Sequence, residues 1–362
     1  MKKVIIISRG NINASPTISN YLKAFQSLNY KVSCICSSKA ENEQLENVDF
    51  HEIGYGNSSN PLMKLLHYFL FGKKVMAILR DLKVDDNTII WVARIDTAIC
   101  LGKKLAKYRS ILSLHELHDT YPFWKYVTKK LVPYYKNLVY NEVNRANIAR
   151  VWYNLSFTPS IIPNKPQAHP LKRDIPIKDK ALFQQIINIK KDKKIILYQG
   201  SLLNDRNIEP LVKASVKFSD KYCLVLMGKD TDNRIAKFLQ INPNLVHISW
   251  VSPPDHLYIT SHAHIGVAFY DFDCLNSIYC APNKIWEYSG FSIPIIGQKI
   301  PGLLNTVAFN SAGICVDIDF EKEITEAITK VDAKYSTYAA NAKQMYDSTD
   351  FNKLVKEAIK KI

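Results

Sequence analysis

The chain alternates between short apolar runs and longer stretches in which apolar residues recur at helical spacing. Residues 4–8 form an apolar run, Ile18, Leu22 and Phe25 then repeat at helical spacing, and residues 31–36 form a second apolar run. A strand, a helix and a second strand in this order are typical of a parallel sheet covered by helices. The same patterns predict strands at 88–92 and 110–114 and helices over 62–82 and 97–107.

A proline-rich segment separates two halves of this kind. It holds five prolines, at positions 159, 163, 166, 170 and 176, which is typical of a linker. Strand patterns follow it at 194–198, 223–227, 245–250 and 265–269, with a helix over 208–218. A chain of 362 residues has the length of two domains. We therefore predict an α/β protein of two Rossmann-like, doubly wound parallel-sheet domains, over 1–165 and 166–342, facing across a ligand cleft. A C-terminal helix over 343–362 is expected to pack back on the first domain.

The composition is that of a folded protein without a membrane span. Apolar residues make up 47% and charged residues 22% of the sequence, which excludes a disordered chain. No stretch of about 18 apolar residues runs without a charge, so no transmembrane helix is expected. The N-terminus lacks the apolar core of a signal peptide, and we expect a cytoplasmic chain. The seven cysteines include no Cys-x-x-Cys pair, which favours reduced, buried thiols.

The net charge of +15 is concentrated in the first half of the chain. Residues 1–165 contain 23 Lys and Arg against 12 Asp and Glu, a net charge of +11, and the remainder carries +4. A positive field of this kind indicates an anionic partner for the first half. Nucleic acid, an anionic membrane surface and a phosphorylated substrate all fit, and charge alone does not choose among them.

Two common nucleotide-binding signatures are missing. No G-x-G-x-x-G follows the run at 4–8, which disfavours a nicotinamide or flavin dinucleotide site. The Gly-Lys pairs that begin at Gly72 and Gly228 have neither the upstream glycine nor the following Ser or Thr of a P-loop. We therefore do not expect an ATPase.

The stretch from Ala281 to Ile296 combines a loop, a short helix and a buried strand entered through Pro294. Lys284 and Glu287 are three residues apart, so both side chains lie on one face of the helix. A lysine can neutralise a phosphate, and a carboxylate can accept hydrogen bonds from ribose hydroxyls. An ordinary Lys–Glu pair on a helix surface is the alternative, and the spacing alone favours it.

This stretch resembles the P-N-K-x-x-E-Y-x-x-x-G-x-P-x-I signature of GT-B glycosyltransferases, in the large retaining family that builds bacterial polysaccharides. Three further segments agree with the resemblance. They are Tyr198-Gln199-Gly200-Ser201-Leu202 followed by Arg206, Val251-Ser252-Pro253-Pro254 followed by Ala263-His264-Ile265-Gly266-Val267, and Ile162-Pro163-Asn164. The resemblance spans nearly the whole chain and implies a GT-B fold.

The resemblance also implies a site for a nucleotide-diphosphate sugar in the second domain. Glu287 would bind the ribose, while Arg206 and Lys284 would steady the diphosphate. The donor-binding residues are then Gly10, Gly200, Arg206, Asn283, Lys284 and Glu287. No bound metal is implied.

Three positions depart from the family pattern. Tyr279 stands where many members have an upstream glutamate, Ser201 where arginine is common, and Asn207 where glycine is usual. The identity of the sugar and the stereochemical outcome therefore do not follow from the resemblance.

A run of polar residues, His115-Glu116-Leu117-His118-Asp119, follows the strand predicted at 110–114. It lies at the carboxyl end of a strand, where the sites of α/β proteins gather. A metal site is one interpretation, although the two histidines do not have the H-E-x-x-H spacing. Capping of a helix by Asp119 or His115 is another. The resemblance favours a third, in which His115, Glu116 and Asp119 are catalytic residues beside the reacting sugar.

Two more positions follow predicted strands of the first half. Arg94 could bind an anionic acceptor or pair with Asp96, and the sequence favours neither interpretation. Gly10 follows the strand at 4–8, where backbone N–H groups could meet a phosphate or the acceptor.

Two basic segments, 63–74 and 121–136, interleave lysines with aromatic residues. Trp, Tyr and Lys together suit the headgroup layer of a membrane, where each cation contributes about 1 kcal/mol on anionic lipid. The alternative is a helix that buries its aromatic residues in the core. A nucleic-acid partner is not expected, because no recognisable binding motif accompanies the charge.

We therefore expect a hexosyltransferase of retaining type. It would move a sugar from a nucleotide-diphosphate sugar to a lipid-linked saccharide, in the synthesis of a capsule, O-antigen or exopolysaccharide. It would work in the cytoplasm, bound peripherally to the inner face of the cell membrane. A nucleotide-sugar epimerase of similar fold and a non-catalytic scaffold subunit are the alternatives.

Overall fold

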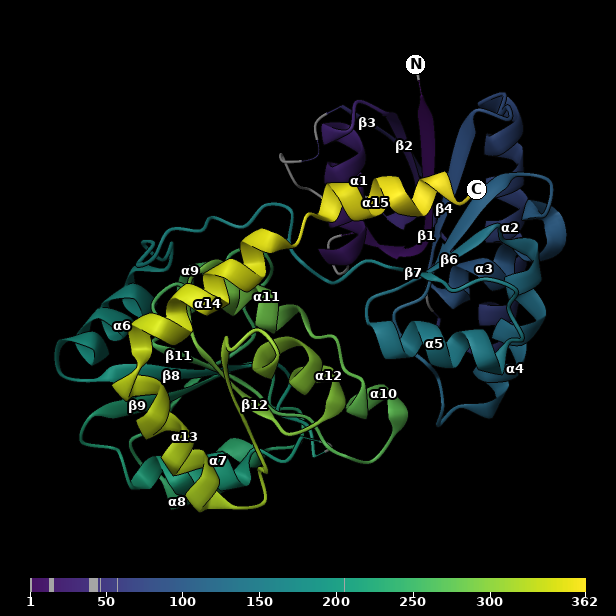
Figure 1. Cartoon of the computed structure of the whole chain (residues 1–362). Coiled ribbons are helices and arrows are strands. Elements are labelled where there is room, and N and C mark those ends of the chain that lie inside the picture. The colour runs from purple at the N-terminus through teal and green to yellow at the C-terminus, as the bar shows by residue number, and fades with distance from the viewer. Residues whose placement is uncertain (1, 13–15, 39–44, 46, 57, 205) are drawn as a thin grey trace. The chain divides into compact units, whose positions relative to one another are not determined.

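The computed structural model describes residues 2–12, 16–38, 45, 47–56, 58–204 and 206–362. The chain divides into two compact units. Met1–Gln167 and Asp350–Ile362 form unit 1, and Ala168–Thr349 form unit 2. Each unit contains a parallel sheet flanked by helices (Figure 1). The α/β class and the two parallel sheets predicted from the apolar pattern are confirmed.

Unit 1 is built on a parallel sheet whose described strands run in the order β3-β2-β1-β4-β5-β6-β7. The strands are β1 (Lys3–Asn11), β2 (Lys31–Ser38), β3 (Val48–Glu52), β4 (Thr88–Ala93), β5 (Arg109–Ser113), β6 (Asn137–Tyr140) and β7 (Ser160–Ile161). In the register of the sheet, Ile6 of β1 pairs with Cys34 of β2 on one side and with Trp91 of β4 on the other. The strand order reverses here, so the carboxyl ends of β1 and β4 form a switch point of the kind that binds ligands.

Helices cover this sheet. α1 (Pro16–Ser27) and α15 (Phe351–Lys360) contact each other, and the Tyr21 ring centroid lies 4.6 Å from that of Trp91 and 5.5 Å from that of Phe351. α3 contacts both α2 and α4. The remaining helices of unit 1 are α2 (Pro61–Asp81), α3 (Ile95–Leu101), α4 (Pro122–Leu131) and α5 (Val143–Trp152), with 3-10 turns η3 (Gly102–Leu105) and η4 (Val132–Tyr134).

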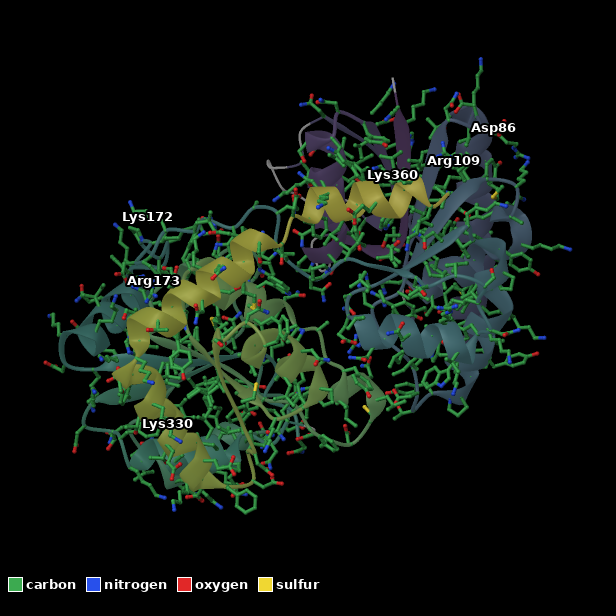
Figure 2. The ribbon with its side chains drawn as sticks, viewed as in Figure 1. Asp86, Arg109, Lys172, Arg173, Lys330 and Lys360 are labelled. Carbon is green, nitrogen blue, oxygen red and sulfur yellow. The ribbon has the colours of Figure 1, made fainter. Side chains whose placement is uncertain are left out.

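Two helices occupy the C-terminal region in which one helix is expected over 343–362. α14 (Tyr335–Ser348) belongs to unit 2, and α15 begins after Asp350, whose carboxylate accepts a hydrogen bond from the Lys353 amide at 2.9 Å. Arg109 of β5 donates to the carbonyl of Ile362 at 3.2 Å, which fastens the end of α15 to unit 1. Figure 2 labels Arg109 and, on α15, Lys360.

Unit 2 contains a second parallel sheet, in the order β10-β9-β8-β11-β12-β13 over its described residues. Its strands are β8 (Lys194–Gln199), β9 (Tyr222–Met227), β10 (Val246–Ile248), β11 (Ile265–Ala268), β12 (Ile295–Gln298) and β13 (Gly313–Val316). Its helices are α6 (Lys180–Asp192), α7 (Glu209–Val216), α8 (Arg234–Ile241), α9 (His256–Thr260), α10 (Leu275–Ile278), α11 (Asn283–Gly290), α12 (Pro301–Leu303), the π-helical η5 (Leu304–Ala308), α13 (Glu321–Ala333) and α14.

Three expectations from the sequence concern the linker, the cysteines and membrane-spanning helices. Residues 162–179, between β7 and α6, form neither helix nor strand. All seven cysteines are free thiols, and five of them are buried. Within the described ranges, no helix is both long enough and apolar enough to cross a membrane.

Candidate functional site

Two glycines shape the carboxyl edge of the unit 2 sheet, where β8 and β9 end. Gly200 follows β8 with a φ of +143°, a conformation that other residues rarely adopt. Gly228 follows β9 and packs against Gly200. A Cβ atom on residue 228 would lie 1.9 Å from the Gly200 carbonyl oxygen. The two loops then join through a hydrogen bond of 2.9 Å from the Leu202 amide to the Lys229 carbonyl. The glycines therefore allow the loops after β8 and β9 to pack closely against each other.

α11 enters the same edge of the sheet as a buried helix. Tyr288 fixes it, because its hydroxyl donates to the carbonyl of Leu197 in β8 at 3.0 Å and its ring packs on Gly266 of β11. Pro282 precedes the helix and has no side-chain group that could cap the first N–H groups. The positive end of α11, starting at Asn283, is thus available to an anion.

Lys284, in the first turn of α11, is a buried cation. Its ammonium nitrogen lies 4.4 Å from the ring centroid of Tyr198 and 5.2 Å from that of Tyr270. It also lies 3.0 Å from the point that a Cβ atom on Gly200 would occupy. Among the described residues, it has no hydrogen-bond or ion-pair partner, and its direct contacts are with two aromatic rings.

Arg206 contacts the Tyr270 ring as well. Its guanidinium carbon is 4.9 Å from the Tyr270 centroid. Burial and, after it, the Arg206 charge lower the pKa of Lys284 to about 7, against the opposing effect of Glu287. Two cations thus share a partly buried site, which makes the site strongly attractive to a phosphate group.

Glu287 lies one turn after Lys284 and is engaged through both carboxylate oxygens. Oε1 lies 3.2 Å from Nε2 of His256, and Oε2 accepts a hydrogen bond from the amide of Gln199. Oε1 of Gln199 in turn accepts from the Thr260 hydroxyl at 2.7 Å. Nε2 of His169, from the linker, lies 2.9 Å from the Glu287 carbonyl oxygen. The carboxylate is therefore fixed in one orientation.

The His256–Glu287 contact is an ion pair. Burial raises the pKa of Glu287, but His256, His169 and Lys284 together outweigh burial, and the pKa lies below its ordinary value. Burial lowers the pKa of His256, but Glu287 and Asp255 together outweigh burial, and the pKa lies above its ordinary value. Both shifts favour the charged forms, an imidazolium beside a carboxylate.

In unit 1, His115 directly follows β5 and Leu114. Its Nε2 lies 3.3 Å from the Ser113 hydroxyl, and its carbonyl oxygen accepts a hydrogen bond from Arg145. Nδ1 is buried and has no hydrogen-bond partner in the parts of the chain described. Burial, then Arg145 and Arg94, lower the pKa of His115 to about 4, so the ring is neutral at pH 7.

The other members of this cluster differ in exposure. Glu116 is exposed, with Oε2 3.8 Å from Nδ1 of His118, and Asp119 is partly buried. The helix-cap interpretation is wrong for both Asp119 and His115, because the following helix begins at Pro122 with Tyr121 as its N-cap residue. No group of three or more His, Cys, Asp or Glu side chains that could hold a metal ion occurs in the described residues.

Arg94 and Gly10 also lie at carboxyl ends of unit 1 strands. Arg94 has a φ of +72°. Its Nε lies 3.4 Å from a carboxylate oxygen of Asp96, so the structure contains the Arg94–Asp96 ion pair, one of the two interpretations that the sequence allows. β1 continues to Asn11, so Gly10 lies within the strand and does not follow it. Its amide donates to the Ser8 hydroxyl at 3.3 Å, where the register of β1 with β2 shifts between Ser8 and Asn11.

Comparisons with known proteins give a match at the level of structure. No family model matches the chain, and no curated protein matches it in sequence. Sucrose-phosphate synthase from Thermosynechococcus elongatus superposes with a TM-score of 0.73 at 15% identity, covering 99% of this chain and 97% of that one. HepE from Anabaena, in complex with UDP and glucose, gives 0.74 at 12% identity over 100% of both chains. WaaG, a glycosyltransferase involved in lipopolysaccharide biosynthesis, gives 0.65 at 12% identity over 98% of both. The chain has the GT-B fold.

Within this GT-B chain, the structure brings together in unit 2 four of the residues that the resemblance implies. Gly200, Lys284 and Arg206 surround one aromatic pair, and Glu287 lies one helical turn from Lys284. Asn283 is the first residue of α11. His115, Glu116, Asp119, Arg94 and Gly10 lie on unit 1.

Sequence reasoning missed several side chains of the unit 2 site. His256 and Thr260 are 31 and 27 residues before Glu287, and no spacing rule relates them to it. Gln199 carried a usable signal, since it is a polar residue at the carboxyl end of a buried apolar strand. Tyr270, just after β11, carried a similar one.

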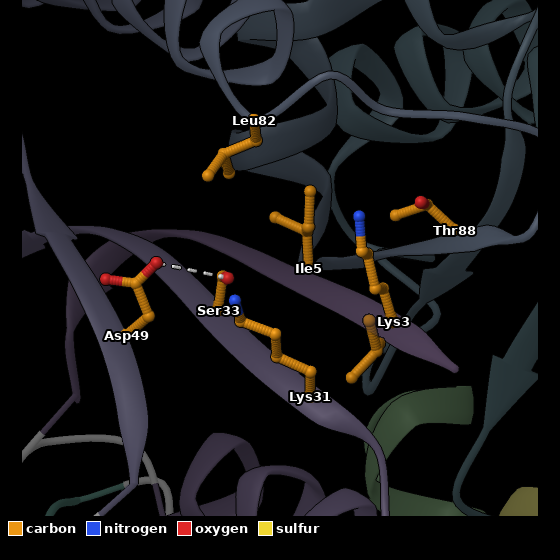
Figure 3. Close-up of a pocket in the computed structure, with 8 residues that line it drawn as sticks. Lys3, Ile5, Lys31, Ser33, Asp49, Leu82 and Thr88 are labelled. Atoms are coloured by element: carbon orange, nitrogen blue, oxygen red, sulfur yellow. Dashed lines mark hydrogen bonds between the residues drawn. The ribbon is translucent and has the colours of Figure 1, made fainter. Parts of the chain in front are cut away.

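The cavities at the opposite edge of unit 1 do not belong to this GT-B site. One of about 60 Å³ is lined by Lys3, Lys31 and Ser33, at the amino ends of β1 and β2 (Figure 3). The Ser33 hydroxyl there donates to Asp49 at 3.5 Å. A larger one of about 530 Å³ lies beside Lys3 and Arg109. Ligands of doubly wound sheets bind instead at the carboxyl ends of the strands.

Proposed function

We propose that this chain is a glycosyltransferase whose unit 2 binds a nucleotide-diphosphate sugar. The observation that carries the proposal is Lys284, a buried amine that lies near Arg206. Lys284 has no hydrogen-bond or ion-pair partner among the described residues. Burying an uncompensated charge is costly, so a protein keeps one where a ligand supplies the counter-charge. The HepE structure holds UDP and glucose on the same fold, which supports a diphosphate as that ligand.

The diphosphate would lie between the two cations and the first turn of α11. Lys284, Arg206 and the N–H groups from Asn283 onward are all donors, and Lys284 lies beside the Gly200 backbone. As the bond from the sugar to the diphosphate breaks, negative charge develops on the leaving group. Donors already oriented toward it stabilise the transition state more than the ground state. Glu287 would accept hydrogen bonds from the ribose.

Unit 1 would hold the saccharide acceptor and the catalytic residues His115, Glu116 and Asp119. A pKa of about 4 makes His115 a neutral ring with a free acceptor nitrogen, which suits it to orient a hydroxyl. The carboxylates of Glu116 and Asp119 are the stronger candidates for accepting the proton of that hydroxyl. Arg94, about half exposed, would bind an anionic group of the acceptor. Gly10 would approach the donor with its backbone. We propose that no bound metal is needed, since Arg206 and Lys284 would stabilise the leaving group, and we propose retention of configuration on the resemblance to the retaining family.

We further propose that the acceptor is lipid-linked and that unit 1 docks on an anionic membrane. The supporting observation is α2, whose first half presents its apolar side chains to solvent. Leu62 is 79% exposed, Leu65 is 69% exposed and Phe69 is 64% exposed, at the helical spacing of one face. The buried face of the helix starts only at Phe71. In this segment Phe69 therefore lies outside the core, while Phe71 is buried in it.

α4 repeats this arrangement beside a different part of the sheet. Phe123 is 68% and Tyr126 is 61% exposed, while Lys129 and Lys130 lie on the last turn and are exposed as well. α3 lies between α2 and α4 and contacts both. Apolar and aromatic side chains bordered by lysines fit the headgroup layer of an anionic bilayer. A peripheral enzyme at the cytoplasmic face of the membrane, in polysaccharide synthesis, would present such a surface.

A transfer assay tests the proposed function. The chain is incubated with radiolabelled nucleotide sugars and a lipid extract, and lipid-bound sugar is measured. We expect label in the lipid fraction, with nucleoside diphosphate as the second product. A new isomer from the donor alone would identify an epimerase, and absence of nucleotide binding would identify a scaffold.

A further inference from the structure

The carboxylate of Glu287 has two protein partners on α9 and β8 that the proposed function does not use. Nε2 of His256 contacts Oε1 directly, and Gln199 donates to Oε2. His256 and Thr260 are the first and last residues of α9, and Thr260 reaches the same carboxylate through Gln199. One helical turn thus holds both oxygens of Glu287.

This arrangement leaves some of the hydrogen-bond acceptor sites of the Glu287 carboxylate available to a ligand. An ionised carboxylate has about four acceptor sites. Two are occupied by His256 and Gln199, so two remain on a group that is otherwise buried. A ribose ring offers two neighbouring hydroxyls, which matches the number of free acceptor sites.

His256 also sets the charge of this group. The imidazole and the carboxylate are 15% and 11% exposed, so water screens the pair weakly. Charged or titratable groups near the pair include Asp255, next to His256, His169 from the linker, Lys284 and Tyr288 on α11, and Tyr270 after β11. His256 is the largest of the charges that oppose burial at Glu287, and it favours the ionised carboxylate, which accepts more hydrogen bonds than the neutral acid.

We propose that His256 is a positioning residue for the donor, which holds the Glu287 carboxylate ionised and oriented toward the ribose hydroxyls. The inference rests on the proposed function, because it assigns a partner to the residue that would bind the ribose. The site would then prefer ribonucleotides over deoxyribonucleotides, and this preference would depend on His256 even if His256 does not contact the sugar.

The test measures whether the effect of replacing His256 depends on a single hydroxyl of the ligand. UDP, GDP, ADP and CDP are titrated into the wild-type chain, and the tightest binder is compared with its 2′-deoxy form. The same two ligands are titrated into His256→Ala and His256→Gln. His264→Gln is the matched control, because His264 also pairs with a carboxylate, Asp332 at 2.8 Å, in unit 2.

We expect His256→Ala to weaken binding of the ribonucleotide about tenfold or more, and binding of the 2′-deoxy form much less. His256→Gln retains a hydrogen-bond donor and should recover part of the loss, which also keeps the test valid if His256→Ala fails to fold. Equal weakening of both ligands, or none, would overturn the role of His256. If no nucleoside diphosphate binds the wild-type chain, the proposed donor site itself is wrong.

Discussion

Replacing Lys284 should change stability and ligand binding in opposite directions. Its pKa falls from 10.5 to about 7 in the folded chain, so between those values the unfolded chain binds a proton that the folded chain does not. Stability without ligand therefore rises with pH through this range. At pH 8 the shift corresponds to a destabilisation of about 3 kcal/mol, at 1.36 kcal/mol per pH unit. Lys284→Met removes this penalty and should stabilise the ligand-free chain, while it weakens nucleotide binding.

Proton uptake on binding tests the same reasoning directly. A diphosphate beside Lys284 returns its pKa toward the ordinary value, so binding at pH 8 should take up about 0.9 proton. Isothermal titration in buffers of different ionisation enthalpy measures this number. Lys284→Arg should bind without that uptake, because arginine stays charged. Lys330→Met, on the exposed face of α13, should leave it unchanged. Equal proton uptake in the wild type and Lys284→Arg would refute the assignment of a buried lysine to the diphosphate.

Three further predictions concern other parts of the chain. Glu287→Gln should weaken nucleoside diphosphate binding about tenfold in a calorimetric titration, since a neutral amide replaces the ribose acceptor. Leu65→Ser with Phe69→Ser should reduce co-sedimentation with anionic vesicles at low salt and leave nucleotide affinity unchanged. Asp332→Asn should destabilise unit 2 by about 2 kcal/mol at pH 7 in urea unfolding, because two lysines and His264 lose their common carboxylate.

Each of these predictions has its own control and counter-result. Unchanged affinity in Glu287→Gln would remove the ribose role. Leu239→Ser, an exposed leucine of unit 2, should leave vesicle binding intact, and wild-type binding that shows no preference for anionic over neutral vesicles would exclude membrane docking. The hydrogen bonds of Asp332 depress its pKa, so its stabilisation is present above about pH 4 and lost as the pH falls further. A difference between Asp332→Asn and wild type that does not shrink as the pH falls below about 4 would contradict that assignment.

The long apolar runs could be predicted from sequence because tertiary context does not override them. The runs at 4–8, 88–92 and 194–198 became β1, β4 and β8, and the stretch from Ala281 gave α11. β3, β6, β7 and β13 were missed, because they have two to five residues and some are partly exposed. Short strands of this kind are recruited by a neighbouring strand and leave little pattern of their own.

The donor site was predictable only where residues share a helix. Lys284 and Glu287 are related by spacing, but their partners His256 and Tyr270 come from other elements of the unit 2 sheet. The sequence also did not predict which face of α2 is exposed to solvent. Helical spacing places Leu65 and Phe69 on one face, but both faces of α2 carry apolar residues, and only packing decides which is buried.

Nucleotide binding by unit 2 is tested most directly by a thermal-shift screen of the wild-type chain with UDP, GDP, ADP, CDP and dTDP. A ligand at 100 times its Kd stabilises the folded state by about 2.7 kcal/mol, which raises the melting temperature measurably. We predict a rise with at least one of the five, lost in Arg206→Ala combined with Lys284→Met. No rise with any of them, at millimolar concentration, would contradict a nucleotide-sugar site in this chain.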